Sequence, residues 1–376
     1  MVYDDSYHVY YNRVYFNYFG ILLFGILIAG IDLKTLRNEI LWEFERDEGY
    51  NPSESAIQLK KILKIAFKVF CYLTLIQGIY FSYILFFGSS DVVSGVWGMF
   101  VGQFALFYVF IFLGVVIFLL KMKNRLGNPR SYKAVALIGL TCSVTFLLPF
   151  SATPFTIYSA ENQTSHAFGP DWKSTIPPSV EREYFLPDPY PSALEYFLGK
   201  QPQDCEADPH VLFYKGTEGV DEGLRLHFDA YMPKGNVKEL PGNGSIIIWI
   251  HGGGWVIGDK GNYRVQINRY FAAQGYVVFD IQYGLTELDG NLGGLTTPDY
   301  VQGDCSINDM VRHIGIFTKY LTSHSNEYNA NLNSVFITGG SAGGHLTCAT
   351  ALSMSHGHYE DYFSPTLKIK GYIPLY

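Results

Sequence analysis

The chain has 376 residues and a formal net charge of −7, with 48% hydrophobic, 16% aromatic and 16% charged residues. An acidic chain without a basic patch is not typical of nucleic-acid-binding proteins, because phosphate contacts need clustered lysine and arginine. The hydrophobic content is high for a purely soluble protein. The excess lies before residue 150, where the composition changes abruptly.

Four apolar segments in the first part of the chain are long enough to cross a bilayer, which takes about 20 residues of helix. They are Tyr15–Ile31, Ile65–Phe87, Val92–Leu120 and Ala134–Phe150. We therefore expect residues 1–150 to form a membrane anchor of about four transmembrane helices. The alternative is that these segments pack as the core of a soluble protein.

Lysine and arginine are distributed unevenly among the loops of this anchor, and this distribution predicts its orientation. The first and third connections are rich in both residues, whereas the short second connection has none and the N-terminal tail has only Arg13. We expect the basic loops in the cytosol and the C-terminal region on the lumenal or extracellular side. Two N-glycosylation sequons, at Asn162 and Asn243, lie on that side. Residues 1–14 lack a cleavable signal-peptide pattern, so the first span is expected to act as the targeting signal.

Residues 151–223 differ in composition from the anchor, because they are rich in proline, aspartate and aromatic residues. Such a composition favours extended or turn conformations, and we interpret the segment as a linker or a cap. The C-terminal region holds three cysteines, and an oxidising compartment would permit one disulfide among them. We expect Cys205 to pair with Cys305, because Cys348 lies within a predicted helix and is expected to be packed.

Residues 224–376 alternate between apolar runs and helical patterns, which is typical of a mostly parallel sheet with helices on both faces. The segment Leu224–Met232 alternates like an antiparallel edge strand. The other expected elements are the strands Ser245–Ile250, Gly275–Ile281 and Ser334–Thr338, and the helices Asn262–Gln274 and Cys305–Thr322.

A glycine-rich string, His251-Gly252-Gly253-Gly254, follows the first of these apolar strands directly. A loop without side chains can bring backbone N–H groups close to a substrate. Donors of this kind stabilise the negative oxygen of a tetrahedral intermediate, and losing one costs roughly 3–4 kcal/mol. We expect the amides of Gly252 and Gly253 to form part of an oxyanion hole.

A second string, Gly339-Gly340-Ser341-Ala342-Gly343, fits the G-x-S-x-G pattern between a strand and a helix. In this pattern the strand turns so sharply into the helix that the serine stands exposed and its neighbours must be small. We expect Ser341 to be a nucleophile and the amide of Ala342 to be the third oxyanion donor.

From about Leu224 to Tyr376 the chain resembles an α/β-hydrolase-fold esterase of the hormone-sensitive-lipase-like group, in which HGGG precedes GxSxG. The resemblance extends to the multi-span esterases that demethylate prenylcysteine. It implies that the segment Tyr184–Leu198 covers the acyl pocket, unless it is a plain surface linker. One departure is that the D-Y-R string of the group reads Asp280-Ile281-Gln282-Tyr283-Gly284, so the arginine is absent.

A serine nucleophile needs a histidine base and a carboxylate that orients the histidine. The resemblance implies that both follow Ser341, after two strands beyond the apolar run Ile369–Tyr376. We therefore expect the triad acid and histidine to be missing from this chain, either because it is an incomplete product or because it is a naturally short form. The groups that do follow the serine lie in or near its helix and are not expected to act as the base or the acid: His345, His356, His358, Glu360 and Asp361.

We expect a membrane-anchored serine carboxylic-ester hydrolase that acts on a hydrophobic, lipid-like ester. Trp255, next to the oxyanion glycines, offers an apolar wall, and the anchor brings the site close to lipid. No metal or other cofactor is expected, since no zinc-like spacing of cysteine and histidine occurs. The alternative is a noncatalytic, hydrolase-like membrane protein that binds a partner or a lipid.

Overall fold

The computed structural model describes residues 54–88, 92–126, 129–184, 196–197, 204–261, 264–287, 297–357 and 359–376. The chain divides into two compact units. The first comprises Met1–Thr175 with Asp188–Ala193, and the second comprises Ile176–Pro187 with Leu194–Tyr376.

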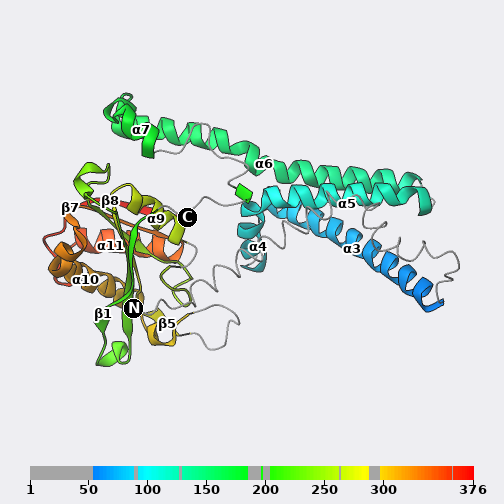
Figure 1. The fold of residues 1–376 in the computed structure, drawn as a ribbon. Helices are drawn as coiled ribbons and strands as arrows, with labels where there is room; N and C mark the ends of the chain where they lie inside the picture. The colour runs from blue at the N-terminus through cyan, green and yellow to red at the C-terminus, as the bar shows by residue number, and fades with distance from the viewer. Residues whose placement is uncertain are drawn as a thin grey trace. The chain divides into compact units, whose positions relative to one another are not determined.

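Long helices make up the described part of the first unit (Figure 1): α3 (Glu54–Phe87), α4 (Val92–Gln103), α5 (Ala105–Leu126) and α6 (Pro129–Phe168). Glycines allow close contacts between them. A Cβ atom at Gly78 would lie 2.5 Å from the ring of Phe112 on α5, and one at Gly139 would lie 2.2 Å from Val116. Small residues at helix contacts are typical of helices that pack within a membrane.

Two helical stretches of the described residues, Val69–Phe87 and Lys133–Phe168, are long and apolar enough to cross a membrane. The expected span Val92–Leu120 is instead divided at Phe104 into α4 and α5, and the apolar part of α5, Ala105–Leu120, is shorter. The expected first span, Tyr15–Ile31, lies outside the described residues. Four transmembrane helices are therefore not confirmed, and two helices of this kind are weak evidence for a membrane anchor.

The helix α6 continues past residue 150 to Phe168, through Pro149 and Pro154. The expectation of an extended or turn conformation is therefore wrong for residues 151–168. The change in composition near residue 150 therefore does not mark the end of this helix. Further along, the short helices η1 (Trp172–Thr175) and α7 (Pro178–Tyr184) follow.

A sheet of six strands organises the second unit, in the order β1-β2-β4-β3-β7-β8. The four strands from β4 to β8 are parallel to one another, whereas β1 and β2 pair antiparallel with each other and β2 pairs antiparallel with β4. The bounds are β1 (Glu206–Lys215), β2 (Arg225–Met232), β3 (Ser245–Ile250), β4 (Val277–Ile281), β7 (Asn331–Gly340) and β8 (Ile369–Leu375), and a small separate sheet pairs β5 (Leu285–Thr286) with β6 (Gln302–Gly303).

The expected strand Leu224–Met232 is antiparallel, as its alternation indicates, but it is not at the edge of the sheet. The strand β1 covers it, and β1 comes from the segment that we expected to be a linker. Its pairing is irregular, with a register shift between Asp208 and Val211 and a positive φ of 62° at His210. This bulge breaks the alternation on which strand prediction depends.

Helices cover both faces of this sheet. Inward residues of one face, such as Ile248 and Phe279, pack with Phe317 of α10 (Ile307–His324) and Leu346 of α11 (Ala342–Ser355). On the other face Ile247 packs with α9 (Val265–Ala273). The strands β3 and β4 are buried on both faces, which explains the continuous apolar sequence of β3; β4 is apolar except for the buried Asp280.

The disulfide that we expected between Cys205 and Cys305 is not formed, and both thiols are free and buried. The reason is their position. Cys205 belongs to the apolar cluster on one face of the sheet and Cys305 to the cluster on the other. The expectation of a packed Cys348 is also wrong, because its side chain is exposed on α11.

Candidate active site

Ser341 stands at a strained turn between β7 and α11. Its φ of 55° and ψ of −120° lie in a region that side-chain-bearing residues rarely adopt, and it is exposed. A Cβ atom at Gly339 would lie 2.5 Å from the carbonyl oxygen of Gly343, and a Cβ atom at Gly343 would lie 2.1 Å from that of Ile250. The turn therefore needs both glycines of the G-x-S-x-G string.

The glycine string His251–Gly254 lies against this turn. The strands β3 and β7 are neighbours, with Ile250 opposite Gly339, so the residues that follow the two strands emerge side by side. A Cβ atom at Gly252 would lie 2.7 Å from the carbonyl oxygen of Gly340 and 3.3 Å from Cβ of Ser341. The structure thus brings the two strings together, although they lie far apart in the sequence.

The backbone of this loop adopts conformations that favour glycine. Gly253 has a φ of 129° and Gly254 a φ of 61°. A Cβ atom at Gly253 would lie 1.8 Å from the carbonyl oxygen of Ile257. Within the described part of the chain, the amides of Gly252, Gly253 and Ala342 donate no hydrogen bond. They remain available to an oxygen atom of a substrate.

His251 is buried and acts as a structural residue of the loop. Its Nδ1–H donates to the carbonyl oxygen of Gly252 at 2.8 Å, and its ring stacks on that of Tyr283 with centroids 4.4 Å apart. Burial lowers the pKa of His251 to about 4, so the ring is neutral at physiological pH. The Tyr283 hydroxyl in turn donates to the carbonyl oxygen of His251 at 2.9 Å.

The segment that follows Tyr283 holds the other end of the same loop. The amide of Thr286 donates to the carbonyl oxygen of Trp255 at 3.0 Å. Between these two attachments, the amide of Gly284 donates to Nδ1 of His313 at 3.1 Å. A Cβ atom at Gly284 would lie 2.8 Å from that imidazole ring, so any side chain at this position would overlap His313.

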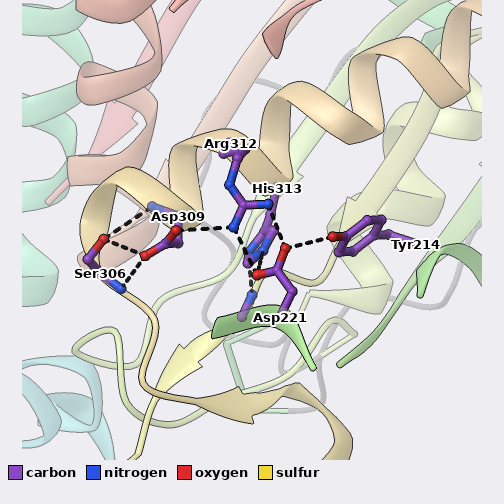
Figure 2. A network of polar contacts seen from close by, with 7 residues as sticks. Tyr214, Asp221, Ser306, Asp309, Arg312 and His313 are labelled. Atoms are coloured by element: carbon purple, nitrogen blue, oxygen red, sulfur yellow. Dashed lines mark hydrogen bonds and ion pairs between the residues drawn. The ribbon is translucent and has the colours of Figure 1, made fainter. Parts of the chain in front are cut away.

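Asp221 is the centre of a polar network that sequence reasoning did not find (Figure 2). It accepts hydrogen bonds from the Tyr214 hydroxyl at 2.6 Å, from Arg312 at 2.6 and 2.8 Å, and from Nε2 of His313 at 3.0 Å. Because Nδ1 of His313 accepts from Gly284, the hydrogen is on Nε2. Burial alone would raise the pKa of Asp221, but the hydrogen bonds from His313, Arg312 and Tyr214 hold it well below its usual range.

The start of α10 supports this network. Ser306 and Asp309 form a reciprocal capping box, and Asp309 also accepts from Arg312 at 3.1 Å. The network therefore joins α10 to the loop that precedes β2, and through His313 it reaches the segment that is attached to the glycine loop His251–Gly254.

A second set of buried charges anchors the chain beyond the glycine loop. Lys260 forms an ion pair with Asp229 at 2.7 Å, and the exposed fractions of the two side chains are 1% and 3%. Next to it, the amide of Gly261 donates to Asp280 at 2.9 Å, and Asn268 donates to the same oxygen at 3.0 Å. Burial, with the nearby charge of Asp229, raises the pKa of Asp280 to about 7.

The structure brings none of the described acid and histidine candidates into a hydrogen bond with the Ser341 side chain. His345 is exposed and packs edge to face against the Trp255 ring, with centroids 5.3 Å apart. His356 is exposed at the end of α11, and Glu360 and Asp361 are exposed in the short helix η6 (Glu360–Tyr362). His358 lies outside the described residues.

The two sequon asparagines are exposed, Asn162 within α6 and Asn243 in the turn before β3, where its φ is 46°. Over the described residues, no group of histidine, cysteine and carboxylate side chains is arranged to hold a metal ion.

Residues 228–372 match the family described as BD-FAE. A protein of Mycobacterium tuberculosis described as the probable carboxylic ester hydrolase LipM is 26% identical over 139 residues, which cover 37% of this chain and 28% of that protein. This chain therefore matches less than a third of the length of that relative.

Solved structures with a similar fold include esterase B from Lactobacillus rhamnosis, at 22% identity and a TM-score of 0.32 over 57% of this chain and 56% of that one. Another is esterase 2 from Thermogutta terrifontis in its native state, at 22% identity and a TM-score of 0.28 over 41% and 44%. Residues 228–372 are thus similar to an esterase family, and their sheet order and serine turn are those of an α/β-hydrolase-like fold.

Proposed function

We propose that this protein is a membrane-anchored serine hydrolase of carboxylic esters, with Ser341 as the nucleophile. The observation that supports the proposal is a strained, exposed serine with Gly252 close to it, together with the amides of Gly252, Gly253 and Ala342, which donate no hydrogen bond within the described residues. Such preorganised donors stabilise the transition state without reorganisation at the moment of reaction.

In this mechanism Oγ of Ser341 attacks the carbonyl carbon of the ester while its proton passes to a general base. The carbonyl oxygen gains negative charge and accepts hydrogen bonds from the three amides. The carbon–oxygen bond to the alcohol then breaks, the alcohol leaves with the proton, and an acyl-serine remains. Water hydrolyses this acyl group and restores the serine.

We propose that the base and its carboxylate partner are residues other than His345, His356, Glu360 and Asp361. The contact of His345 with Trp255 and the exposed positions of the other three support this assignment. His251 is equally unsuited, since it is buried, donates to Gly252 and has a pKa lowered to about 4.

We propose that the first unit is a membrane anchor because large apolar side chains of its helices are exposed. Large apolar residues of α3 and α6 are more than half exposed, among them Leu73, Ile76 and Leu137. With 40 residues, α6 is about 60 Å long, which is about twice the thickness of the hydrocarbon core of a bilayer. We propose that its end around Asn162 extends into water on the lumenal or extracellular side.

The substrate is proposed to be a hydrophobic, lipid-like ester. Trp255 adjoins the oxyanion glycines and packs against the core, and it presents an apolar ring beside the serine turn. Hydrolysis of p-nitrophenyl butyrate by the full-length protein, compared with its Ser341→Ala variant, tests the activity. Loss of hydrolysis in the variant supports the proposal. Equal rates for the two proteins would contradict it.

Sensitivity to a glycosidase tests the orientation. A decrease in mass on treatment of the membrane-bound protein, absent in the Asn162→Gln/Asn243→Gln double variant, supports a lumenal or extracellular position. Labelling of either segment by a cytosolic reagent would overturn it.

A further inference from the structure

Arg264 lies directly before α9, at the end of the chain segment that begins with the oxyanion glycines. Its side chain is half-buried, and its guanidinium carbon is 4.9 Å from the centroid of the Trp249 ring. Stacking of this kind is favourable for a planar cation on an indole face. The stacking fixes the plane of the guanidinium, and its N–H groups, which point outward in that plane, stay free to donate to other partners.

The guanidinium lies beside the residue that precedes the nucleophile. A Cβ atom at Gly340 would be 2.8 Å from Nη2 of Arg264, so the cation occupies the space of a side chain at that position. On its other side, the carbonyl oxygen of Gly340 would lie 2.7 Å from a Cβ atom at Gly252, so the two backbones are neighbours. The positive charge of Arg264 therefore lies next to Gly340, which precedes the proposed nucleophile Ser341 and neighbours Gly252 of the proposed oxyanion hole.

No carboxylate pairs with this cation among the residues that the structure describes. Arg264 has neither an ion pair nor a hydrogen bond in that part of the chain. Asp280 and Tyr283 influence it at longer range. Oδ2 of Asp280 accepts from Gly261 and Asn268, whereas its Oδ1 has no hydrogen-bond partner, and the Tyr283 hydroxyl donates to His251. Neither residue forms a hydrogen bond or an ion pair with Arg264 among the described residues.

We propose that Arg264 is a specificity-determining residue that binds a carboxylate of the ester substrate, close to the bond that Ser341 attacks. The planar guanidinium donates two parallel N–H bonds to a carboxylate, a geometry that no other side chain offers. A half-buried cation without a partner is costly, and a bound carboxylate would relieve that cost. The substrate class is then an amphiphilic ester, with an apolar chain and a carboxylate on either its acyl or its alcohol side.

This inference rests on the proposed function, and matched pairs of esters test it with the full-length protein. Phenyl hexanoate and monophenyl adipate have acyl chains of equal length and differ by a terminal carboxylate on the acyl side. Phenyl acetate and 4-acetoxybenzoate differ by a carboxylate on the alcohol side. The measured quantity is the ratio of kcat/KM for the anionic ester to that for the neutral ester in each pair.

We expect the wild-type protein to favour the anionic member of one pair. Arg264→Met should lower that ratio by about tenfold or more, the value of a hydrogen-bonded charge pair. Gly340→Asp should lower it as well, because the new carboxylate would pair with Arg264 in place of the substrate. Arg264→Lys should retain part of the preference. Arg269→Met, which removes an arginine from within α9, serves as the control and should leave the ratio unchanged.

The inference is overturned if the ratio of kcat/KM for the anionic and neutral esters is the same in the wild-type protein and in Arg264→Met. This holds even if Arg264→Met hydrolyses both esters more slowly by the same factor. That result leaves the proposed function intact, since the neutral esters are still hydrolysed by the wild-type protein. If the wild-type protein hydrolyses no member of either pair, the proposed function fails and the role of Arg264 falls with it.

Discussion

The hydroxyl of Tyr283 donates a 2.9 Å hydrogen bond to the carbonyl oxygen of His251, and the rings of the two residues stack on each other. This contact joins the segment after β4 to the first residue of the glycine loop His251–Gly254. Because Gly252 and Gly253 follow His251 directly, the orientation of their amides depends on where this carbonyl is held.

Tyr283→Phe should therefore impair catalysis more than substrate binding. The variant keeps the stacked ring but leaves the carbonyl oxygen of His251 without its partner, which costs about 1 kcal/mol of stability. We expect kcat to fall roughly tenfold with little change in KM, because displaced donors act mainly on the transition state. Steady-state kinetics and thermal unfolding measure the two effects. Tyr276→Phe is the control, and an equal loss in both variants would count against the role of Tyr283.

Gly253→Ala should abolish hydrolysis, because the new Cβ atom would lie 1.8 Å from the carbonyl oxygen of Ile257 and φ at this position is 129°. The loop must shift, and removing one oxyanion donor costs about 100- to 1,000-fold in kcat. Gly303→Ala offers a matched control, since the nearest atom to its Cβ would be 3.4 Å away. A Gly253→Ala variant with wild-type kcat would contradict the assignment of this amide to the oxyanion hole.

Asp221→Asn should destabilise the hydrolase unit by about 2–4 kcal/mol, because Arg312 and His313 lose a charged acceptor in a buried network. The pKa of Asp221 is lowered in the folded protein, so its contribution is present above the ordinary value near 3.8 and is lost as the pH falls below it. Urea unfolding at several pH values checks both points. Glu222→Gln, an exposed neighbour, should have little effect. A similar cost for the two variants would refute the network's role.

We expect Asp280 to give the free energy of unfolding the opposite dependence on pH. Its pKa is about 7 in the folded protein and near 3.8 in the unfolded chain, so the folded state binds the proton more tightly. The free energy of unfolding should therefore fall as the pH rises from about 4 to about 7, by at most about 1.4 kcal/mol per pH unit. Asp280→Asn should flatten this part of the curve. Parallel curves for the two proteins would show that Asp280 does not titrate in this range.

The parts of the fold that the sequence predicted are those whose pattern is local. The apolar run Ser245–Ile250 is β3 to the residue, because a parallel strand buried on both faces needs continuous hydrophobicity. The serine turn could also be predicted from the sequence, since its backbone excludes side chains at Gly339 and Gly343.

Other features depend on contacts between distant residues and could not be predicted in this way. The strand β1 was missed because a bulge at His210 interrupts its alternation. The network of Asp221 joins residues more than 90 positions apart, and no spacing in the sequence marks it. The only local sign of it is Gly284, where a Cβ atom would lie 2.8 Å from the His313 ring.

The most direct test of the account is covalent labelling of the full-length protein by a fluorophosphonate, with the modified residue located by mass spectrometry of its peptides. Such a reagent reacts with a serine that has been activated by a base and faces an oxyanion hole. The account predicts a single adduct on Ser341 that is absent from Ser341→Ala and strongly reduced in Gly253→Ala. An unlabelled wild-type protein, or an adduct on another serine that persists in Ser341→Ala, would contradict it and would favour a noncatalytic, hydrolase-like protein.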